Sequence, residues 1–273
     1  MHSTASDGLL PPGAVVRHAA AAGLTAIALT DHDTIAGVVE ASAEGERQGV
    51  RVVSGCEFSA AAPWGEMHVL GYFLPTDDAT LEGFLERCRA DRVRRAREMV
   101  EGLQAWGVDV SFEDVAKETG NAAMGRPHLA RVLVRLGKVA TVDEAFGQWL
   151  GRGRPAYVEK TLPTFREVAE LVHSVGGLVS AAHLKDRGTR AALTAFKEEG
   201  LDAVETRHPS HSGDARAKFT ALAASLGLLR TGGSDWHGDD HGEGNHALLG
   251  SQEVPAEWLE AMDRAYAERR NGA

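Results

Sequence analysis

The segment TAIALTDHDT, residues 25–34, joins an apolar run to a cluster of acidic and histidine side chains. Residues 25–31 have the length and the apolar character of a buried strand. Asp31, His32 and Asp33 occupy its carboxyl end. In folds that alternate strands with helices, the carboxyl ends of the strands gather at one mouth. This stretch therefore predicts a core strand and one part of a shared polar site.

The same arrangement recurs along the chain. Strand patterns at 50–59, 178–183, 201–206 and 228–235 end at or beside Glu57, His183, His208, and Asp235 with His237. A further apolar strand pattern covers 67–74, and helical patterns cover 13–23, 34–49, 164–177, 189–200 and 213–227. This alternation predicts an α/β fold, and favours a barrel of the (β/α) kind over an open sheet.

Residues 80–155 break the alternation. Apolar residues from Leu81 to Trp106 keep helical spacing, and shorter helices are expected at 112–119, 127–136 and 142–150, without strands between them. We therefore expect two domains, a barrel formed by residues 1–79 and 156–273 and a helical insertion formed by residues 80–155.

Charge and cysteine content restrict the function. The net charge of −10 argues against a broad surface for long duplex nucleic acid. Residues 80–160 hold 14 basic and 12 acidic residues, so the remainder carries −12. The arginines at 87–97 suit an anionic substrate or form a solvated helix face. Two isolated cysteines and the lack of a membrane span or cleavable leader predict a cytoplasmic protein.

Strand ends that carry imidazole and carboxylate groups predict a catalytic metal centre. Without thiolates these donors suit Zn²⁺, Mn²⁺ or Fe²⁺, and their number suits two or three ions that share a carboxylate. Such clusters supply hydroxide near neutral pH for in-line displacement at phosphorus.

On a strand, Cys56 should face away from Glu57, and Asp33 is positioned to orient His32. His18 and His173 lie within helix patterns, for which we expect structural roles.

Six ordered motifs resemble those of the PHP family, named for polymerase and histidinol phosphatase domains. They are HSTASDG, TDHDT, GCEFS, HVLGY, AAH and GSDWH. The resemblance implies a distorted (β/α)7-type barrel. GRPHLARVLV and VETRHPSH resemble a bacterial branch with a helical insertion, which hydrolyses 3′,5′-nucleoside bisphosphates and in some members trims short RNA from the 5′ end.

The resemblance also implies roles for individual residues. His2, Glu57 and Asp235 would hold a first ion, Glu57, His68 and His183 a second, and Asp7, His32 and His237 a third. For the substrate we expect Arg126, His128, Lys160, His208 and His211, with Arg126 and His208 also acting in catalysis. His241 and His246 belong to a polar loop that is either a lid or exposed to solvent.

Two departures from the family pattern affect these expectations. The family motif starts with two histidines separated by one residue, after a first strand, and Met1 stands at the spacer position. We therefore expect the natural start to lie upstream, because neighbouring strand edges would otherwise lack a partner, and we expect the first ion to be weakly held, absent or completed by water. AAHL replaces a common His-Pro, which should alter the loop after His183 but keep the ligand.

Three functions remain open at this stage. The first is a nucleotide 3′-phosphatase or short-RNA exonuclease. The second is another metal hydrolase, either a histidinol-phosphate-type monoesterase or an amidohydrolase, and the insertion favours the first over it. The third is a non-catalytic nucleotide-binding or metal-scaffold protein, against which the retained ligands argue.

Overall fold

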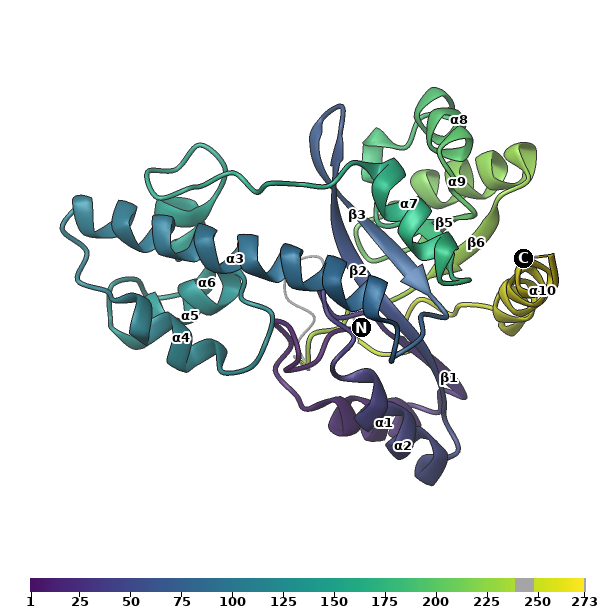
Figure 1. Cartoon of the computed structure of the whole chain (residues 1–273), viewed down its shortest axis with the longest axis horizontal. Coiled ribbons are helices and arrows are strands. Elements are labelled where there is room, and N and C mark those ends of the chain that lie inside the picture. Colours follow the sequence, from purple (N-terminus) through teal and green to yellow (C-terminus); the bar gives the residue numbers. More distant parts are fainter. Residues whose placement is uncertain (239–247, 273) are drawn as a thin grey trace. The chain divides into compact units, whose positions relative to one another are not determined.

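The computed structural model describes residues 1–238 and 248–272. The chain divides into two compact units, one formed by residues 1–82 with 162–273 and the other by residues 83–161. We call them the sheet unit and the helical unit (Figure 1). Of the helices in the described ranges, none is long and apolar enough to traverse a bilayer.

The sheet unit contains a six-stranded sheet whose spatial order follows the chain. The strands are β1 (Ala26–Leu29), β2 (Arg51–Ala62), β3 (Gly65–Tyr72), β4 (Leu178–Ala181), β5 (Ala203–Arg207) and β6 (Leu229–Gly232). The pairs β1 with β2, β4 with β5 and β5 with β6 are parallel. Within the described residues β1 and β6 are the two edges of the sheet. The predicted mixed α/β, barrel-type fold is confirmed in the form of a curled half-barrel.

Strand β3 is the exception to the strand–helix alternation. It pairs antiparallel with both β2 and β4. A tight turn joins β2 directly to β3. Gly65 at this turn has a φ of 112°, a conformation that residues other than glycine rarely adopt. The register sets Leu70 opposite Glu57 and His68 opposite Ser59. The first half of β3 therefore lies at the same end of the sheet as the carboxyl ends of the parallel strands.

Helices cover this sheet and connect its strands. They are α1 (Pro12–Ala21), α2 (Val38–Gln48), α7 (Phe165–Ser174), α8 (Arg190–Glu198), α9 (Gly213–Leu226) and α10 (Ala256–Gly272). Thr164 and Glu167 form a capping box at the start of α7, which satisfies amide groups that a helix start leaves free. Glu57 alternates with Cys56 and Phe58, which are fully buried, as expected of neighbours on opposite strand faces.

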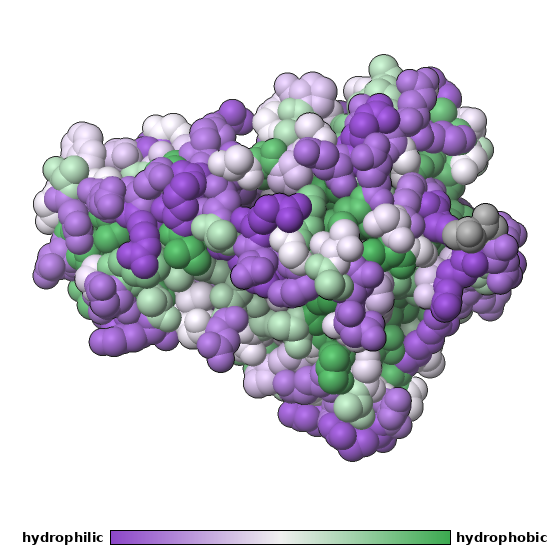
Figure 2. Space-filling model, viewed as in Figure 1, coloured by the Kyte–Doolittle hydropathy of each residue, from purple (hydrophilic) through white to green (hydrophobic). Residues whose placement is uncertain are grey.

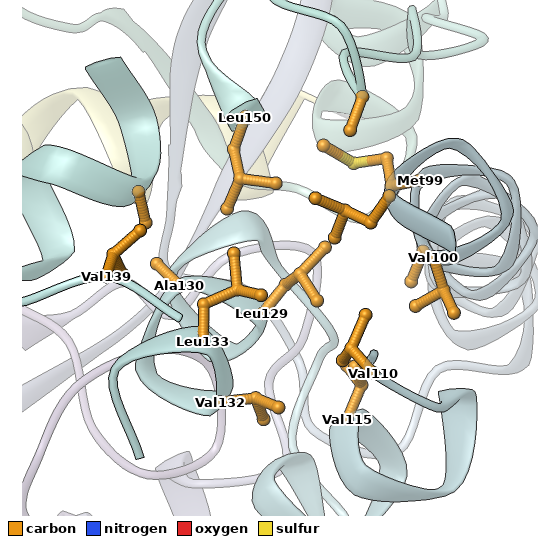
Figure 3. Packing of buried hydrophobic residues seen from close by; sticks show 14 of the residues in the cluster. Met99, Val100, Val110, Val115, Leu129, Ala130, Val132, Leu133, Val139 and Leu150 are labelled. Carbon is orange, nitrogen blue, oxygen red and sulfur yellow. The ribbon is translucent and has the colours of Figure 1, made fainter. Parts of the chain in front are cut away.

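The helical unit has its own core. Most of α3 (Ala79–Ala105) lies in it, followed by α4 (Phe112–Thr119), α5 (Arg126–Arg135), α6 (Val142–Ala145) and the π-turn η1 (Phe146–Leu150). The segment expected as one helix at 142–150 is thus divided between α6 and the π-turn. Figure 3 shows Met99, Leu129, Leu133 and Leu150 pointing toward one another. Hydrophilic residues cover much of the visible surface, with smaller hydrophobic patches between them (Figure 2).

Candidate metal centre

The N-terminal residues are held firmly inside the sheet unit. The amide of His2 donates to the carbonyl of Trp236 at 2.9 Å, and its imidazole stacks on that of His237 with centroids 4.2 Å apart. Only 1% of His2 is exposed. A histidine that would fray at most termini is therefore a fixed, buried group.

Asp31 anchors this N-terminal loop. Its buried carboxylate accepts hydrogen bonds from the amide of Ser3 at 2.7 Å, the hydroxyl of Ser3 at 2.7 Å and the hydroxyl of Ser6 at 2.6 Å. Gly8 permits the tight return of the loop, because a Cβ there would lie 2.6 Å from the carbonyl carbon and oxygen of His2. Asp31 thus acts on the site through the loop, although its sequence position resembles that of a ligand.

Three overlapping groups of donor atoms occur at the carboxyl end of the sheet. In each group the donor atoms lie within 4.8 Å of one another. The groups are His2 with Asp7, His32 and His237; His32 with Glu57 and His68; and His2 with Glu57 and Asp235.

Glu57 connects these groups. Its Oε2 lies 3.0 Å from His2 Nε2, and its Oε1 lies 2.5 Å from His68 Nδ1 and 3.1 Å from His183 Nε2. Asp235 Oδ1 lies 3.2 Å from His2 Nε2. The structure therefore brings all eight sequence-predicted ligands into one cluster.

Several of these side chains, or their neighbours in the chain, have an unusual left-handed backbone conformation. His183 and Asp235 have φ values of 27° and 51°, and Asp33, beside His32, has 51°. Residues other than glycine rarely adopt this left-handed region, and they do so most often at functional sites. The turns that follow β1, β4 and β6 are thus shaped around the polar cluster.

The carboxylates and imidazoles of the cluster shift one another's pKa values. Burial disfavours the cations of His2 and His68, but hydrogen bonds to Asp235 and Glu57 raise the pKa of His2 to about 10, and the charge of Glu57 raises that of His68 to about 9. Burial lowers the pKa of His32 to about 3 despite nearby Asp7. Burial opposes ionisation of Asp7, Glu57 and Asp235, yet neighbouring imidazoles hold the pKa of each well below its usual range.

The cluster fits a divalent cation on chemical grounds. Three carboxylates are ionised, with Glu57 buried and Asp7 and Asp235 half-buried, and protonated imidazoles lie against them. His32 is neutral, which is the form that binds metal. No thiol belongs to the donor groups among the described residues. This donor set suits Mn²⁺, Fe²⁺ or Zn²⁺ in a catalytic site.

His208 borders the cluster and differs from its donors. It follows β5, is 2% exposed, and places Nε2 3.6 Å from Asp235 Oδ2. Ser210 Oγ lies 2.8 Å from its Nδ1. Burial opposes the cation, but the charges of Glu205 and Asp235 raise the pKa of His208. His208 is therefore a buried imidazole with a raised pKa that lies next to the donor cluster.

A cavity of about 370 Å³ extends from the cluster through the sheet unit. Glu57, His183, Glu205, His208 and Asp235 line it at the cluster, and the rest of its lining includes residues 24–28 and 230–233 together with the apolar side chains of Leu249, Leu259 and Met262. Of the eight expected ligands, Glu57, His183 and Asp235 therefore border this space within the sheet unit.

His211 is engaged within the protein. Its Nε2 accepts from the amide of Lys185 at 3.3 Å, and its Nδ1 lies 3.4 Å from the carbonyl of Thr206. Because both ring nitrogens have backbone partners, we do not retain His211 among the proposed substrate ligands.

The other substrate candidates belong to the helical unit. His128 is buried and accepts from the amide of Gly125 at 3.0 Å, which caps α5. Arg126 donates to the carbonyl of Leu150 at 3.3 Å, with Phe146 and Tyr157 beneath its guanidinium. Lys160 is half-buried. His241 and His246 lie outside the described residues.

Sequence reasoning missed Glu205. It is a buried carboxylate on β5 whose Oε2 accepts from the amide of His183 at 2.7 Å. A signal existed, because an acidic residue interrupts the apolar strand pattern AVET two residues before the strand ends.

Comparisons with known proteins agree with this geometry. The PHP domain model matches residues 1–226. A 5′-3′ exoribonuclease from Haemophilus influenzae is 32% identical over 86% of this chain and 88% of its own. A 3′,5′-nucleoside bisphosphate phosphatase from Chromobacterium violaceum is 32% identical over 93% of this chain and 90% of its own.

A solved structure shows the same fold. A proposed metal-dependent phosphoesterase from Bifidobacterium adolescentis superposes with a TM-score of 0.86 at 30% identity, covering 97% of this chain and 94% of its own. The fold and the carboxylate–imidazole cluster define a metal-dependent phosphoesterase. The chain belongs to the PHP domain family.

Proposed function

We propose that this chain hydrolyses the 3′-phosphate of 3′,5′-nucleoside bisphosphates, and that it also removes nucleotides from the 5′ end of short RNA. One observation carries the chemistry, namely the continuous set of donor groups that share His2, His32 and Glu57. The substrate class is supported by the relatives from Chromobacterium violaceum and Haemophilus influenzae, whose names describe these two activities.

The cofactor in this proposal is two or three divalent ions, Mn²⁺, Fe²⁺ or Zn²⁺. His2, Glu57 and Asp235 would hold one, Glu57, His68 and His183 another, and Asp7, His32 and His237 a third. When bound, such ions lower the pKa of water and neutralise charge on phosphate oxygens. Glu57, which is buried, and Asp235, which is half-buried, would supply the negative charge that retains them.

His208 and Arg126 have separate roles in the proposal. In its protonated form His208 carries Nε2–H, 3.6 Å from Asp235 Oδ2, and this proton would pass to the departing ribose oxygen as the phosphorus–oxygen bond breaks, while Nδ1 faces the hydroxyl and the amide of Ser210. The guanidinium of Arg126 would donate hydrogen bonds to a phosphate oxygen, and Lys160 would add a second positive charge. His128 keeps the start of α5 in place for Arg126.

The test is incubation of the Mn²⁺-loaded protein with 3′,5′-adenosine bisphosphate. We expect inorganic phosphate and adenosine 5′-monophosphate in equal amounts, and 5′-mononucleotides from a short 5′-phosphorylated RNA. Adenosine 3′-monophosphate as the product would show that the wrong phosphate had been assigned. Cleavage of histidinol phosphate or of an amide alone would favour the alternative hydrolases, and binding without turnover would favour a scaffold.

A further inference from the structure

The loop that follows β4 has an unfavourable backbone. His183 has a φ of 27° and Lys185 a φ of 57°, although neither is glycine. Residues with a side chain rarely adopt such a conformation, because it brings Cβ too close to the following carbonyl oxygen. The loop also has only the short 3-10 turn Lys185–Arg187 to support it locally. Contacts from elsewhere in the sheet unit must therefore hold it in this shape.

Two such contacts come from one neighbouring segment. The amide of His183 donates to Glu205 Oε2 at 2.7 Å, and the amide of Lys185 donates to His211 Nε2 at 3.3 Å. Glu205 belongs to β5, which pairs with β4, and His211 lies six residues further along the chain. Strand β5 and the loop that follows it thus accept hydrogen bonds from the backbone amides of both His183 and Lys185.

The accepting groups are themselves fixed. Glu205 is 5% exposed and His211 is 3% exposed. Since Nε2 of His211 accepts from Lys185, its Nδ1 carries the ring hydrogen and faces the carbonyl of Thr206 at 3.4 Å. A buried acceptor that loses its donor is costly, so the pairing holds the loop firmly.

The loop conformation decides where the imidazole of His183 lies. Its Nε2 is 3.1 Å from Glu57 Oε1 and 3.2 Å from His68 Nδ1. Relaxation of the φ of His183 into the usual negative region would swing this ring away from both partners. Neither Glu205 nor His211 belongs to the donor groups found in the described part of the chain.

We propose that Glu205 and His211 are positioning residues that clamp the His183–Lys185 loop and thereby aim His183 at the second metal ion. The inference deepens the metal centre proposed above and rests on it. Glu205 acts in this role as a hydrogen-bond acceptor for a backbone amide, and its negative charge is not required. Groups that orient metal ligands in this way typically change metal affinity 10- to 100-fold when removed.

Matched variants at residue 205 test the proposal. Glu205→Gln keeps an oxygen acceptor of the same size but removes the charge, whereas Glu205→Leu removes the acceptor. We expect Glu205→Gln to bind Mn²⁺ within about threefold of the unaltered chain. Glu205→Leu should bind it about 10- to 100-fold more weakly. Its phosphatase activity should recover as Mn²⁺ is raised, because the lost function is affinity. His211→Leu should show the same pattern more weakly, since its hydrogen bond is longer.

A crystal structure of metal-free Glu205→Leu gives a readout that does not depend on activity. We expect the φ of His183 to leave the left-handed region there, and to stay in it for Glu205→Gln. Equal loss of Mn²⁺ affinity in both variants would make the charge essential and overturn the positioning role, as would unchanged affinity in Glu205→Leu. If the unaltered chain bound no Mn²⁺, the metal centre and this inference would both be wrong.

Discussion

His2 Nε2 and Glu57 Oε2 lie 3.0 Å apart, although 55 positions separate the two residues in the chain. The contact exists because the N-terminal loop is anchored on Asp31 and the sheet places Glu57 on β2 beside the end of β1. Glu57 also contacts His68 and His183. One carboxylate therefore joins donors from the terminus, β3 and the turn after β4.

Removal of central donors should abolish turnover without unfolding the chain. For Glu57→Ala and His32→Ala we expect more than about 100-fold loss of phosphate release, because each belongs to two donor groups. Phosphate release from 3′,5′-adenosine bisphosphate and circular dichroism measure the two properties. Arg47→Ala, an exposed change on α2, is the control and should keep full activity. Full activity in either donor variant would remove that residue from the site.

Metal binding should release protons. At pH 7.5 the metal-free protein holds protons on His2, with a pKa of about 10, and on His68, with a pKa of about 9. Both must leave before the imidazoles can bind an ion, whereas His32, with a pKa of about 3, has none to lose. We expect about two protons per fully loaded chain. Calorimetric Mn²⁺ titrations in buffers of different ionisation enthalpy measure this number, and identical heats in all buffers would contradict it.

The metal-free protein should lose stability at both extremes of pH. The pKa values of His2 and His68 are raised, so their contribution is complete below about pH 6.5 and is lost as pH rises through 9 to 10. Those of Asp7, Glu57 and Asp235 are depressed, so their contribution is present above about pH 4 and is lost as pH falls. Urea unfolding from pH 3 to 10.5 should therefore give a maximum near neutrality. A stability that kept rising above pH 9 would be inconsistent with protonated His2 and His68.

Gly8 should tolerate no side chain. In Gly8→Ala the new Cβ would meet the carbonyl group of His2 at 2.6 Å, so we expect a loss of about 1–3 kcal/mol in the free energy of unfolding, with weaker Mn²⁺ binding. Gly83→Ala makes the same change within α3, where no atom lies within 4 Å, and should stabilise by about 0.5–1 kcal/mol. Urea unfolding measures the free energy of unfolding of both variants. If Gly8→Ala were as stable as Gly83→Ala, the N-terminal loop would accommodate the added methyl group without strain.

Proton donation by His208 should depend on the leaving group. His208→Gln should slow release from the ribose of 3′,5′-adenosine bisphosphate by about 100-fold or more, because an alkoxide needs a proton. With p-nitrophenyl phosphate, whose leaving group is stable without one, the loss should be less than about tenfold. Bound Mn²⁺ should remain unchanged in this variant. Equal losses on both substrates would assign His208 a role in metal or phosphate binding.

The local pattern of the chain predicted much of this architecture. Apolar runs of strand length located all six strands, because burial on a sheet selects such runs. Helix α10 was missed, although Trp258, Met262 and Ala265 recur at helical spacing. The antiparallel direction of β3 could not be read from its residues, because a buried strand has the same pattern in either direction.

The polar side chains at the ends of β1, β4 and β6 followed from the sequence alone, since His32, His183 and Asp235 stand where apolar runs stop, whereas Glu57 lies within β2. Only the tertiary structure decided how they are used. Asp31 and His211 have the residue types of ligands, yet Asp31 accepts from an amide and two hydroxyls, His211 accepts from an amide, and both hold loops in place. Glu205 accepts a hydrogen bond from the amide of His183, which lies 22 positions earlier in the chain. These roles depend on which atoms meet across neighbouring strands, and that depends on register and backbone conformation, which no single segment of the chain contains.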